Sequence, residues 1–382
     1  MESVALLDRL IAFPTVSRDS NLDLIGYVRG LLTEHGIEAT LIGSADGRKA
    51  NLFATIGGSG SGGVVLSGHT DVVPTDGQAW TSDPFRMTER DGRLLGRGAA
   101  DMKGFLACAV RAALLAAGRR LRRPLHLAFS YDEELGCLGV RGMLDQLAAS
   151  GLRPEFCIVG EPTGMAVMTG HKGKVAARAT CCGTAAHTAL APRALNAIHL
   201  ATDLVGALRR QQAVLAEGVT QDAAYDVPYT TLHVASIAGG LVSNIVPDRC
   251  AVTFEIRNIA ADDARAVLGD VERDAAALVL AAQARFPQAA IAFEVTNDYP
   301  GLDTPLGAPV VAFACALAGS LPLGKVAFGT EAGLFQQRLG VPGVVCGPGS
   351  MEQGHKPDEF VTREQLGLCD RMMDALLDRL SA

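Results

Sequence analysis

The stretch "VVLSGHTDVVP", residues 64–74, decides the fold of this chain. Its first half is an apolar, β-branched run, which is typical of a strand buried on both faces of a sheet. It ends in His69 and Asp71, where a buried strand by itself has no need of polar side chains. We therefore predict a central strand with a functional pair at its tip, and we interpret that pair as part of a metal centre.

Apolar strands alternate with amphipathic helices on either side of this run, up to about residue 172. The pattern predicts strands at 51–57, 63–69, 125–131 and 155–161, with helices at 104–118 and 140–150. Such alternation indicates an α/β domain with a mainly parallel sheet that is covered by helices on both faces. In sheets of this kind chemistry collects beyond the carboxyl ends of the strands, which is where His69 and Asp71 fall.

The middle of the chain follows a different pattern and predicts a second domain. Strands are expected at 173–182, 230–239, 249–258 and 290–297, and helices at 194–211 and 261–284. This βαββαβ order is that of a ferredoxin-like two-layer sandwich, which can fold on its own. The α/β pattern resumes afterwards, with a helix near 309–318, a strand within 340–349 and a helix from about 363. We therefore expect a discontinuous α/β domain, 1–173 and 298–382, with residues 174–297 inserted into it.

Composition is that of a soluble globular protein. The chain has 382 residues, enough for two domains, and is 48% hydrophobic and 20% charged. A net charge of −7 without a long basic block argues against nucleic-acid binding. Its nine cysteines have no CxxC pair, which favours reduced thiols and a cytoplasmic location. We expect neither a signal peptide nor a membrane span, because the start carries early acids and prolines interrupt the longest uncharged stretch.

Acidic and imidazole side chains follow successive strands of the first segment. Besides His69 and Asp71 they are Asp101, Asp132, Glu133, Glu134 and Glu161. Carboxylates that meet at one sheet edge repel one another strongly unless cations or protons neutralise them. Two divalent cations would do so, and histidine with carboxylates suits Zn²⁺, with Co²⁺ or Mn²⁺ as substitutes.

Each of these residues has a structural alternative when it is taken singly. A histidine at a strand end is more often a hydrogen-bonded turn residue than a metal ligand. Asp101 could cap the following helix, and Glu161 could be an exposed loop acid. Glu133 and Glu134 could lie at a helix N-terminus. Capping does not require acids at successive strand tips, so their joint placement favours the metal centre.

A glycine-rich segment, "GSGSGG" at 58–63, matches the spacing of a dinucleotide-binding loop. The next element is a predicted strand rather than the helix that such a loop requires, so we expect a hairpin turn there. A dinucleotide-dependent oxidoreductase stays an alternative that NAD titration would test. A non-catalytic metal-binding scaffold is a second alternative.

An ordered set of motifs runs along nearly the whole chain: "SGHTDVVP" (67–74), "GRGAADMKGF" (96–105), "DEELGCLG" (132–139), "GEPTG" (160–164), "GHKGK" (170–174), "NIVPD" (244–248), "FGTEAGLF" (328–335) and "GPGSMEQGHKPDEF" (347–360). This set resembles the dinuclear-zinc amidohydrolases of the M20 peptidase family, and within it the branch that acts on N2-acetyl-L-ornithine. The resemblance implies hydrolysis of that acetyl amide to L-ornithine and acetate, in arginine biosynthesis. The alternative substrates are other N-acyl amino acids, such as succinyl-diaminopimelate or acetyl-citrulline, and dipeptides.

The resemblance also implies two Zn²⁺ ions and a ligand set for each. His69 and Glu161 would hold one ion, Glu134 and His355 the other, and Asp101 would bridge them. Spacing alone does not identify His355, which lies after the inserted domain. With a bridging hydroxide between the ions, the charges of the ions and of these carboxylates cancel.

Catalytic residues are implied in the same way. Glu133 would be the general base that takes a proton from the bridging water and passes it to the departing amine. Asp71 would orient His69, as a metal-bound imidazole requires. His187, by itself an ordinary surface-loop histidine, would reach the active site of a partner subunit and stabilise the oxyanion. The protein would then be a homodimer, and residues 174–297 its lid and dimerisation domain.

Substrate contacts are implied at a few further positions. Asn244 and Arg257 match positions at which relatives bind the substrate carboxylate, and a guanidinium can hold two oxygens at once. Arg257 could equally pair with a neighbouring acid on its own sheet. Gly329 and Thr330 would contribute main-chain and hydroxyl contacts. Glu331 is a candidate partner for the side-chain ammonium of ornithine.

Overall fold

A computed structural model describes residues 1–58, 62–319 and 322–381, and the chain divides into two compact units. Unit 1 comprises Met1–His171 and Leu302–Ala382, and unit 2 comprises Lys172–Gly301. The boundaries expected from the sequence, after residues 173 and 297, lie within a few residues of these. Each unit is described below by itself.

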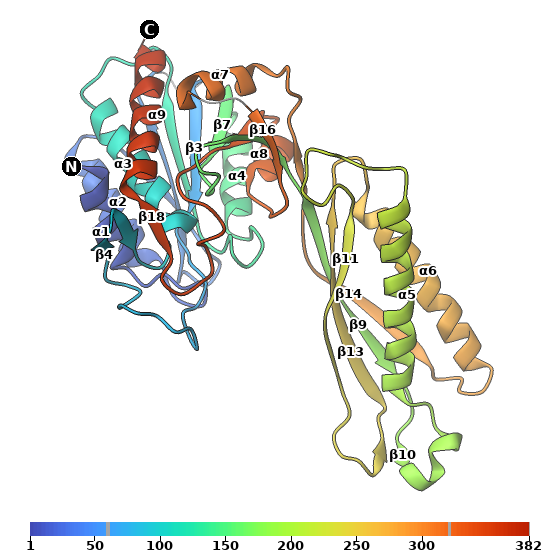
Figure 1. Ribbon diagram of the computed structural model, residues 1–382. Coiled ribbons are helices and arrows are strands. Elements are labelled where there is room, and N and C mark those ends of the chain that lie inside the picture. Colours follow the sequence, from blue (N-terminus) through green and yellow to red (C-terminus); the bar gives the residue numbers. More distant parts are fainter. Residues whose placement is uncertain (59–61, 320–321, 382) are drawn as a thin grey trace. The chain divides into compact units, whose positions relative to one another are not determined.

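Unit 1 is built on a sheet whose central strands are parallel (Figure 1). Across the sheet the strands lie in the order β1 (Ala39–Gly43), β2 (Ala50–Ile56), β6 (Leu125–Ser130), β3 (Val64–His69), β7 (Phe156–Val159), β17 (Gly343–Val345), β8 (Val167–His171) and β15 (Leu302–Asp303), and β16 (Pro322–Val326) also pairs with β8. The four strands β6, β3, β7 and β17 are mutually parallel, whereas β1, β2 and β15 are antiparallel to their neighbours. The predicted α/β class with a mainly parallel central sheet is confirmed.

The remaining elements of unit 1 are helices around this sheet and a small separate sheet. They are α1 (Ser3–Ile11), α2 (Leu22–Glu34), η1 (Ala99–Lys103), α3 (Gly104–Ala116), α4 (Val140–Ser150), α7 (Pro309–Ala318), α8 (Ala332–Leu339) and α9 (Arg363–Ser381), with β4 (Thr88–Arg90), β5 (Arg93–Leu95) and β18 (Phe360–Thr362). Proline at the start of α7 and a left-handed glycine, Gly319, at its end give that helix sharp limits.

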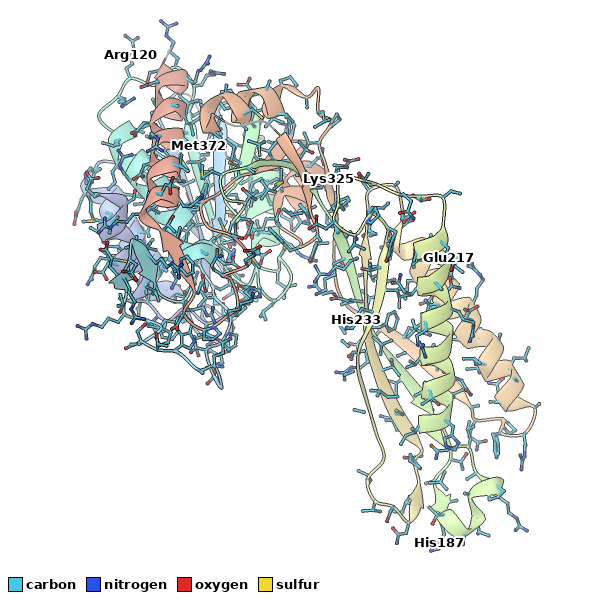
Figure 2. The ribbon with its side chains drawn as sticks, viewed as in Figure 1. Arg120, His187, Glu217, His233, Lys325 and Met372 are labelled. Carbon is cyan, nitrogen blue, oxygen red and sulfur yellow. The ribbon has the colours of Figure 1, made fainter. Side chains whose placement is uncertain are left out.

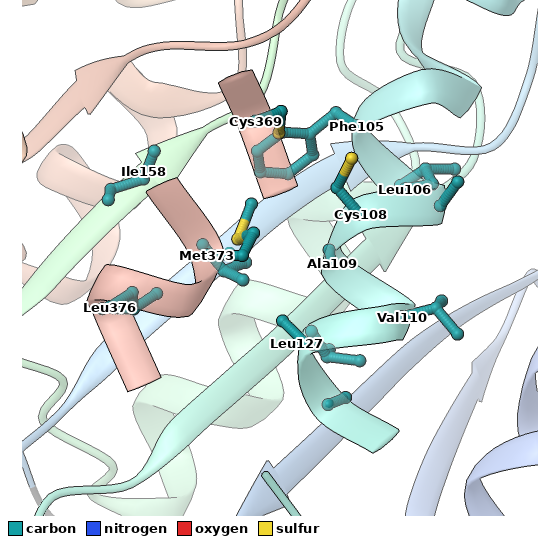
Figure 3. Close-up of a cluster of buried hydrophobic side chains, with 14 of the residues drawn as sticks. Phe105, Leu106, Cys108, Ala109, Val110, Leu127, Ile158, Cys369, Met373 and Leu376 are labelled. Carbon is teal, nitrogen blue, oxygen red and sulfur yellow. The ribbon is translucent and has the colours of Figure 1, made fainter. Parts of the chain in front are cut away.

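The core of unit 1 forms where apolar strands meet an almost wholly apolar helix. Every residue of β3 and of β6 is buried, as expected of strands covered on both faces. Helix α3 packs against α1 and α9 as well as against the sheet, so nearly its whole circumference is buried. Figure 3 shows Phe105 and Cys108 of α3 beside Cys369 and Met373 of α9. Burial of a side chain such as Phe105 stabilises the fold by roughly 1.5–3 kcal/mol.

The predicted hairpin turn at 58–63 is wrong. The flanking strands β2 and β3 are not neighbours, because β6 lies between them, antiparallel to β2 and parallel to β3. Local turn composition predicts a change of direction but not which strand pairs with which. Residues 59–61 themselves lie outside the described residues. The next element after the segment is β3, so the helix of a dinucleotide-binding loop does not follow it.

Unit 2 is a sheet with two long helices. Along the chain its main elements are β9 (Gly173–Cys182), α5 (Ala197–Glu217), β11 (Thr231–Gly239), β13 (Arg249–Asn258), α6 (Ala264–Gln283) and β14 (Ala290–Tyr299). The sheet order is β11-β13-β9-β14, with antiparallel neighbours. Side chains of β9 and β13 alternate between buried and partly exposed positions, because α5 and α6 cover one face of this sheet (Figure 1). The short strands β10 (Ala186–His187) and β12 (Ile245–Val246) pair with each other and adjoin the 3₁₀ helix η2 (Thr188–Arg193).

Two expectations from composition concern cysteines and membranes. All nine cysteines are free thiols, and most of them are buried. Among the helices of the described residues, none has the length and apolar character needed to cross a membrane.

Candidate metal centre

His69 is the last residue of β3, and only 1% of its surface is exposed. Its Nδ1–H donates a hydrogen bond of 2.8 Å to the carbonyl oxygen of Asp71. Because a carbonyl oxygen can only accept, Nδ1 carries the proton, and Nε2 is the nitrogen that faces the other acids. Nε2 lies 3.0 Å from Oδ1 of Asp101 and 3.8 Å from Oε1 of Glu161. The tip of β3 thus presents the nitrogen that a metal ligand needs.

Asp71 does more than support the histidine before it. Its Oδ1 lies 3.5 Å from Nδ1 of His69 and also accepts the backbone N–H of Glu133 at 3.1 Å. Its Oδ2 accepts the backbone N–H of Glu134 at 3.3 Å and the hydroxyl of Ser17 at 2.8 Å. One buried carboxylate therefore fixes both the β3 tip and the acidic loop after β6.

Asp101 lies between both predicted histidine ligands. Its Oδ1 is 3.0 Å from Nε2 of His69, and its Oδ2 is 3.1 Å from Nε2 of His355. It belongs to η1, which leads into α3, and its side chain is buried rather than capping that helix. A carboxylate whose oxygens each face a different histidine is suited to bridging two cations.

The acidic loop after β6 delivers two carboxylates with different surroundings. The carboxylate of Glu134 contacts Nε2 of His355, with its nearer oxygen at 3.1 Å. Glu133 instead accepts a hydrogen bond from the thiol of Cys137, at 3.3 Å from Sγ to Oε1. Neither residue belongs to a helix N-terminus, since α4 begins only at Val140. Asp132, which precedes them, forms an ion pair with Lys49 instead.

Glu161 and His355 complete the cluster from opposite halves of the discontinuous unit. Glu161 follows β7 and is buried, so it is not an exposed loop acid. A Cβ on the preceding Gly160 would lie 1.9 Å from the ring of Phe105, so only glycine lets the end of β7 approach α3 this closely. His355 has a positive φ of 60° and a side chain that is 45% exposed, which makes it the most accessible member of the cluster.

Burial dominates the charge state of these carboxyl groups. It raises the pKa of Glu133 to about 8 and that of Glu134 to about 7, with neighbouring carboxylates adding to the effect. Burial also raises the pKa of Glu161 well above its usual range. Burial acts in the same direction on Asp101, but its contacts with the two histidines hold the pKa of this carboxyl below its usual value.

The two histidines respond in the opposite sense to the surrounding acids. Hydrogen bonds with Asp101 and Glu134 raise the pKa of His355 to about 10. Burial by itself would lower the pKa of His69, but Asp101, Asp71 and Glu161 raise it well above its usual value. With protons as the only cations, this cluster therefore retains them near neutral pH.

The donor set fits divalent cations. Ligand atoms of His69, Glu133 and Glu161 lie within 4.8 Å of one another, as do those of His69, Asp101 and Glu134. Buried carboxylates with raised pKa values are relieved when a metal ion replaces the protons. These groupings differ from the predicted ligand sets, because they include Glu133, the predicted base, place His69 with Glu134, and do not contain His355.

The predicted residues of unit 2 fall into two separate places. His187 pairs with Ile245 across β10 and β12, and the carbonyl oxygen of Asn244 accepts the N–H of the residue after His187, so these two exposed side chains are neighbours. The N–H of Ala189 donates to Nδ1 of His187 at 3.1 Å, which leaves Nε2–H of the neutral ring as a donor. Figure 2 places His187 at the opposite end of unit 2 from Glu217.

Arg257 lies near the far end of β13 from Asn244. Eight residues separate Arg249 and Arg257 along this strand, or roughly 25 Å at about 3.3 Å per residue. One copy of unit 2 therefore does not bring Asn244 and Arg257 to the same carboxylate. Arg257 pairs with Glu255 at 3.0 Å and donates to the hydroxyl of Tyr299 at 2.9 Å, which agrees with the alternative of a neighbouring acid.

The remaining predicted contacts adjoin α8. Gly329 is half-buried, whereas Thr330 is fully buried and its hydroxyl accepts the N–H of Ala332, the first residue of α8. Glu331 is also buried, and its carboxylate accepts hydrogen bonds from Ser67 at 3.1 Å and Ser130 at 2.5 Å. These hydroxyls use two of the acceptor positions of the carboxylate, and its pairing with a substrate ammonium stays a prediction.

Sequence reasoning missed several residues that hold the cluster in place. Ser17 supports Asp71, and Glu359 accepts the backbone N–H of Asp101 while pairing with Arg97. The sequence held one clue to Arg97 and Glu359, because each is a charged residue inside one of the quoted motifs, "GRGAADMKGF" and "GPGSMEQGHKPDEF". No periodicity links them, so only the folded chain reveals the pair.

Comparisons with known proteins agree on one family. The family model described as "Peptidase family M20/M25/M40" matches residues 65–379. An acetylornithine deacetylase from Myxococcus xanthus is 36% identical over 376 residues, covering 97% of this chain and 95% of the relative. An M20 family metallo-carboxypeptidase from Sulfolobus solfataricus has a similar fold, with a TM-score of 0.79, 18% identity and coverage of 100% of this chain and 99% of its own. A dinuclear metal binding peptidase of the M20 family from Bacillus subtilis also has a similar fold, with a TM-score of 0.68 and 17% sequence identity. The match covers 99% of this chain and 97% of that chain.

Proposed function

We propose, on the premise that the chain belongs to peptidase family M20/M25/M40, that it hydrolyses N2-acetyl-L-ornithine to L-ornithine and acetate. The chain is a metal-dependent amidohydrolase of that family, so the proposal concerns its substrate and the way its residues work. The supporting observation is the meeting of His69, Asp101 and His355 with buried carboxylates whose protons a metal ion would replace. The relative from Myxococcus xanthus, which carries the name of this activity, supports the choice of substrate.

The residues of the cluster divide naturally into two cation positions. His69 and Glu161 would hold one Zn²⁺, Glu134 and His355 a second, and Asp101 would lie between them, since each of its oxygens faces a different histidine. Bound zinc supplies Lewis acidity to an amide carbonyl and lowers the pKa of a nearby water toward ~7. Co²⁺ or Mn²⁺ would suit the same nitrogen and oxygen donors.

Glu133 is the residue to which we assign proton transfer. Burial raises the pKa of this carboxyl to about 8, and cations placed nearby would lower it again toward neutral, where a general base works best. Its Oε1 accepts the thiol of Cys137, which keeps the side chain turned toward the cluster. Glu133 would take a proton from the attacking water at one carboxylate oxygen and return it to the nitrogen of the departing amine.

His187 and Asn244 are assigned to the site of a partner subunit in a homodimer. Nδ1 of His187 accepts the N–H of Ala189, so the proton of the neutral ring is on Nε2. An N–H donor of this kind can stabilise a developing oxyanion. Several apolar side chains near this tip are exposed to solvent, and Leu241 is 93% exposed. Exposed apolar residues that gather in this way favour a protein interface.

Recognition of the substrate carboxylate is assigned to Arg257. Its guanidinium already contacts Glu255 and Tyr299, which fix its orientation, and a planar guanidinium suits a carboxylate better than an ammonium does. Gly329 is the second candidate contact, through its main chain.

The nine free cysteines support a cytoplasmic location, where arginine biosynthesis would use the product.

A substrate panel tests the proposal. The purified zinc-loaded protein is assayed with N2-acetyl-L-ornithine, acetyl-citrulline, succinyl-diaminopimelate and a dipeptide under the same conditions. We expect the highest kcat/KM for N2-acetyl-L-ornithine. A higher kcat/KM for another member of the panel would show that the proposed substrate is wrong, although the reaction would still be amide hydrolysis.

A further inference from the structure

A buried ion pair lies directly behind the proposed metal ligands and has no part in the mechanism above. Arg97 and Glu359 are each 1% exposed, and NH1 of the arginine is 2.6 Å from Oε2 of the glutamate. Burying such a pair carries a desolvation cost that its own attraction does not reliably offset. The other contacts of the two side chains therefore indicate what the pair does.

Glu359 fixes the backbone that leads to Asp101. Its Oε2 accepts the N–H of Gly98 at 3.1 Å, and its Oε1 accepts the N–H groups of Ala100 and Asp101, both at 3.0 Å. Charge-assisted hydrogen bonds to several backbone groups of one segment are strong and directional. They set the place from which the side chain of Asp101 reaches both histidines.

Arg97 extends the same pair to the loop that carries His355. Its NH1 donates to the carbonyl oxygen of Lys356 at 3.3 Å, and its NH2 donates to Oε1 of Gln78 at 2.6 Å. Gln78 in turn donates through Nε2 to the carbonyl oxygen of His355 at 3.1 Å. The indole of Trp80 adds a further contact, since its N–H donates to Oε1 of Gln78 and its ring lies 5.0 Å from the guanidinium carbon.

Gln78, Arg97 and Glu359 therefore link the backbone of Asp101 to the backbone of His355. The His355 loop benefits from such support, because residues 346–359 form no helix and no strand longer than the bridge at Ser350, and His355 itself has a positive φ. Regular elements lie closer to two of the other proposed ligands: His69 is the last residue of β3, and Asp101 belongs to η1, which leads into α3.

We propose that Gln78, Arg97 and Glu359 are positioning residues: they hold His355 close enough to Asp101 for both to bind one cation. They would thereby set the affinity for the second cation, the one assigned to Glu134 and His355. This inference rests on the proposed two-metal function. It assigns no contact with substrate to the three residues. Outer partners of metal ligands typically change metal affinity by about 10–100-fold when they are altered.

The isosteric variant Gln78→Glu tests the inference with little risk to folding, because Gln78 is only half-buried. It keeps an oxygen acceptor for Arg97 and Trp80 but places a second oxygen, in place of the Nε2 donor, against the carbonyl oxygen of His355. Arg97→Lys is the second variant, since an ammonium cannot reach Glu359, Lys356 and Gln78 with the same fork. Arg111→Gln is the matched control, because it removes a half-buried ion pair with Asp374 in the same unit.

The measurement is calorimetric titration of metal-free protein with Zn²⁺, repeated with Co²⁺ while its visible absorption is recorded. We expect two ions per chain in the wild type and the control. In Gln78→Glu and Arg97→Lys the first ion should bind normally, the second about 10–100-fold more weakly, and the absorption of the second Co²⁺ should change. The melting temperature of metal-free Gln78→Glu should equal that of the wild type.

The contrary outcomes are distinct. Unchanged affinities in both variants, with or without a lower melting temperature, would overturn the positioning role and leave the proposed function intact. A wild-type protein that binds no metal ion would overturn the proposed function and this inference together.

Discussion

The cluster at the sheet edge of unit 1 and the tip of unit 2 use polar residues in opposite ways. In unit 1, the carboxylates are buried and backbone N–H groups fix several of them, as Glu359 and Asp71 illustrate. At the tip, His187 and Asn244 are exposed, and the N–H of Ala189 donates to the ring of His187. The cluster of unit 1 is thus assembled within one chain, whereas the proposed use of the tip needs a second chain.

Glu133→Gln should give the largest effect. The amide keeps the shape of the side chain but cannot accept a proton, so kcat should fall by about 10²–10⁴-fold, the usual contribution of a general base. Both metal ions should stay bound, because Glu133 is assigned to proton transfer and not to their coordination. Metal analysis and kcat are measured on the same preparation. Wild-type activity, or loss of one ion, would contradict this division of roles.

His187→Ala should lower kcat by about 10²–10³-fold, as expected when one oxyanion donor is removed. The more telling experiment mixes this variant with Glu133→Gln under conditions that exchange subunits. In a mixed dimer, the intact His187 of one chain would complete the site that contains the intact Glu133 of the other chain. About half of the dimers would be mixed, with one complete site of two, so roughly a quarter of wild-type activity should return. If the mixture stays as inactive as its components, His187 does not act across an interface.

The stability of metal-free protein should fall as the pH rises, which distinguishes unit 1 from the tip. The folded-state pKa values of Glu133 and Glu134, about 8 and about 7, lie above those of exposed glutamates, so the folded state binds extra protons between about pH 4.5 and 8. His355, with a pKa of about 10, extends the same trend upward from about pH 6.5. The melting temperature should therefore drop by several degrees between pH 5.5 and 8.5.

Added Zn²⁺ should remove that trend, because metal binding takes the place of the protons. The matched control is the same pH series on protein saturated with Zn²⁺. A melting temperature of metal-free protein that rises over this range would show that the buried carboxyl groups are not protonated.

The sequence predicted the positions of the strand-tip residues of the cluster because these positions follow from periodicity. His69 and Glu161 directly follow apolar runs, and runs of that kind become central strands whose carboxyl ends share one edge. His355 has no such signal, since it lies on a turn loop with a positive φ, and only the family resemblance pointed to it. Glu359 and Arg97 were missed because Glu359 accepts backbone N–H groups and Arg97 donates to a backbone carbonyl oxygen, and a sequence does not show where such groups point.

Tertiary pairing explains why the hairpin prediction failed. The turn at 58–63 was taken for a hairpin because its glycines predict a reversal, but β6 pairs between the flanking strands. Asn244 and Arg257 were grouped by the resemblance, whereas the length of β13 separates them within one chain. At 58–63, local composition indicated a change of direction but not which strands pair on either side of it.

The metal content of the protein tests the central claim most directly. Protein is stripped with a chelator, shown to be folded by its circular dichroism, dialysed against Zn²⁺ and analysed for zinc per chain. The account predicts two zinc ions, held by the histidines and carboxylates at the edge of the unit 1 sheet. A folded protein that retains no zinc, cobalt or manganese would contradict it.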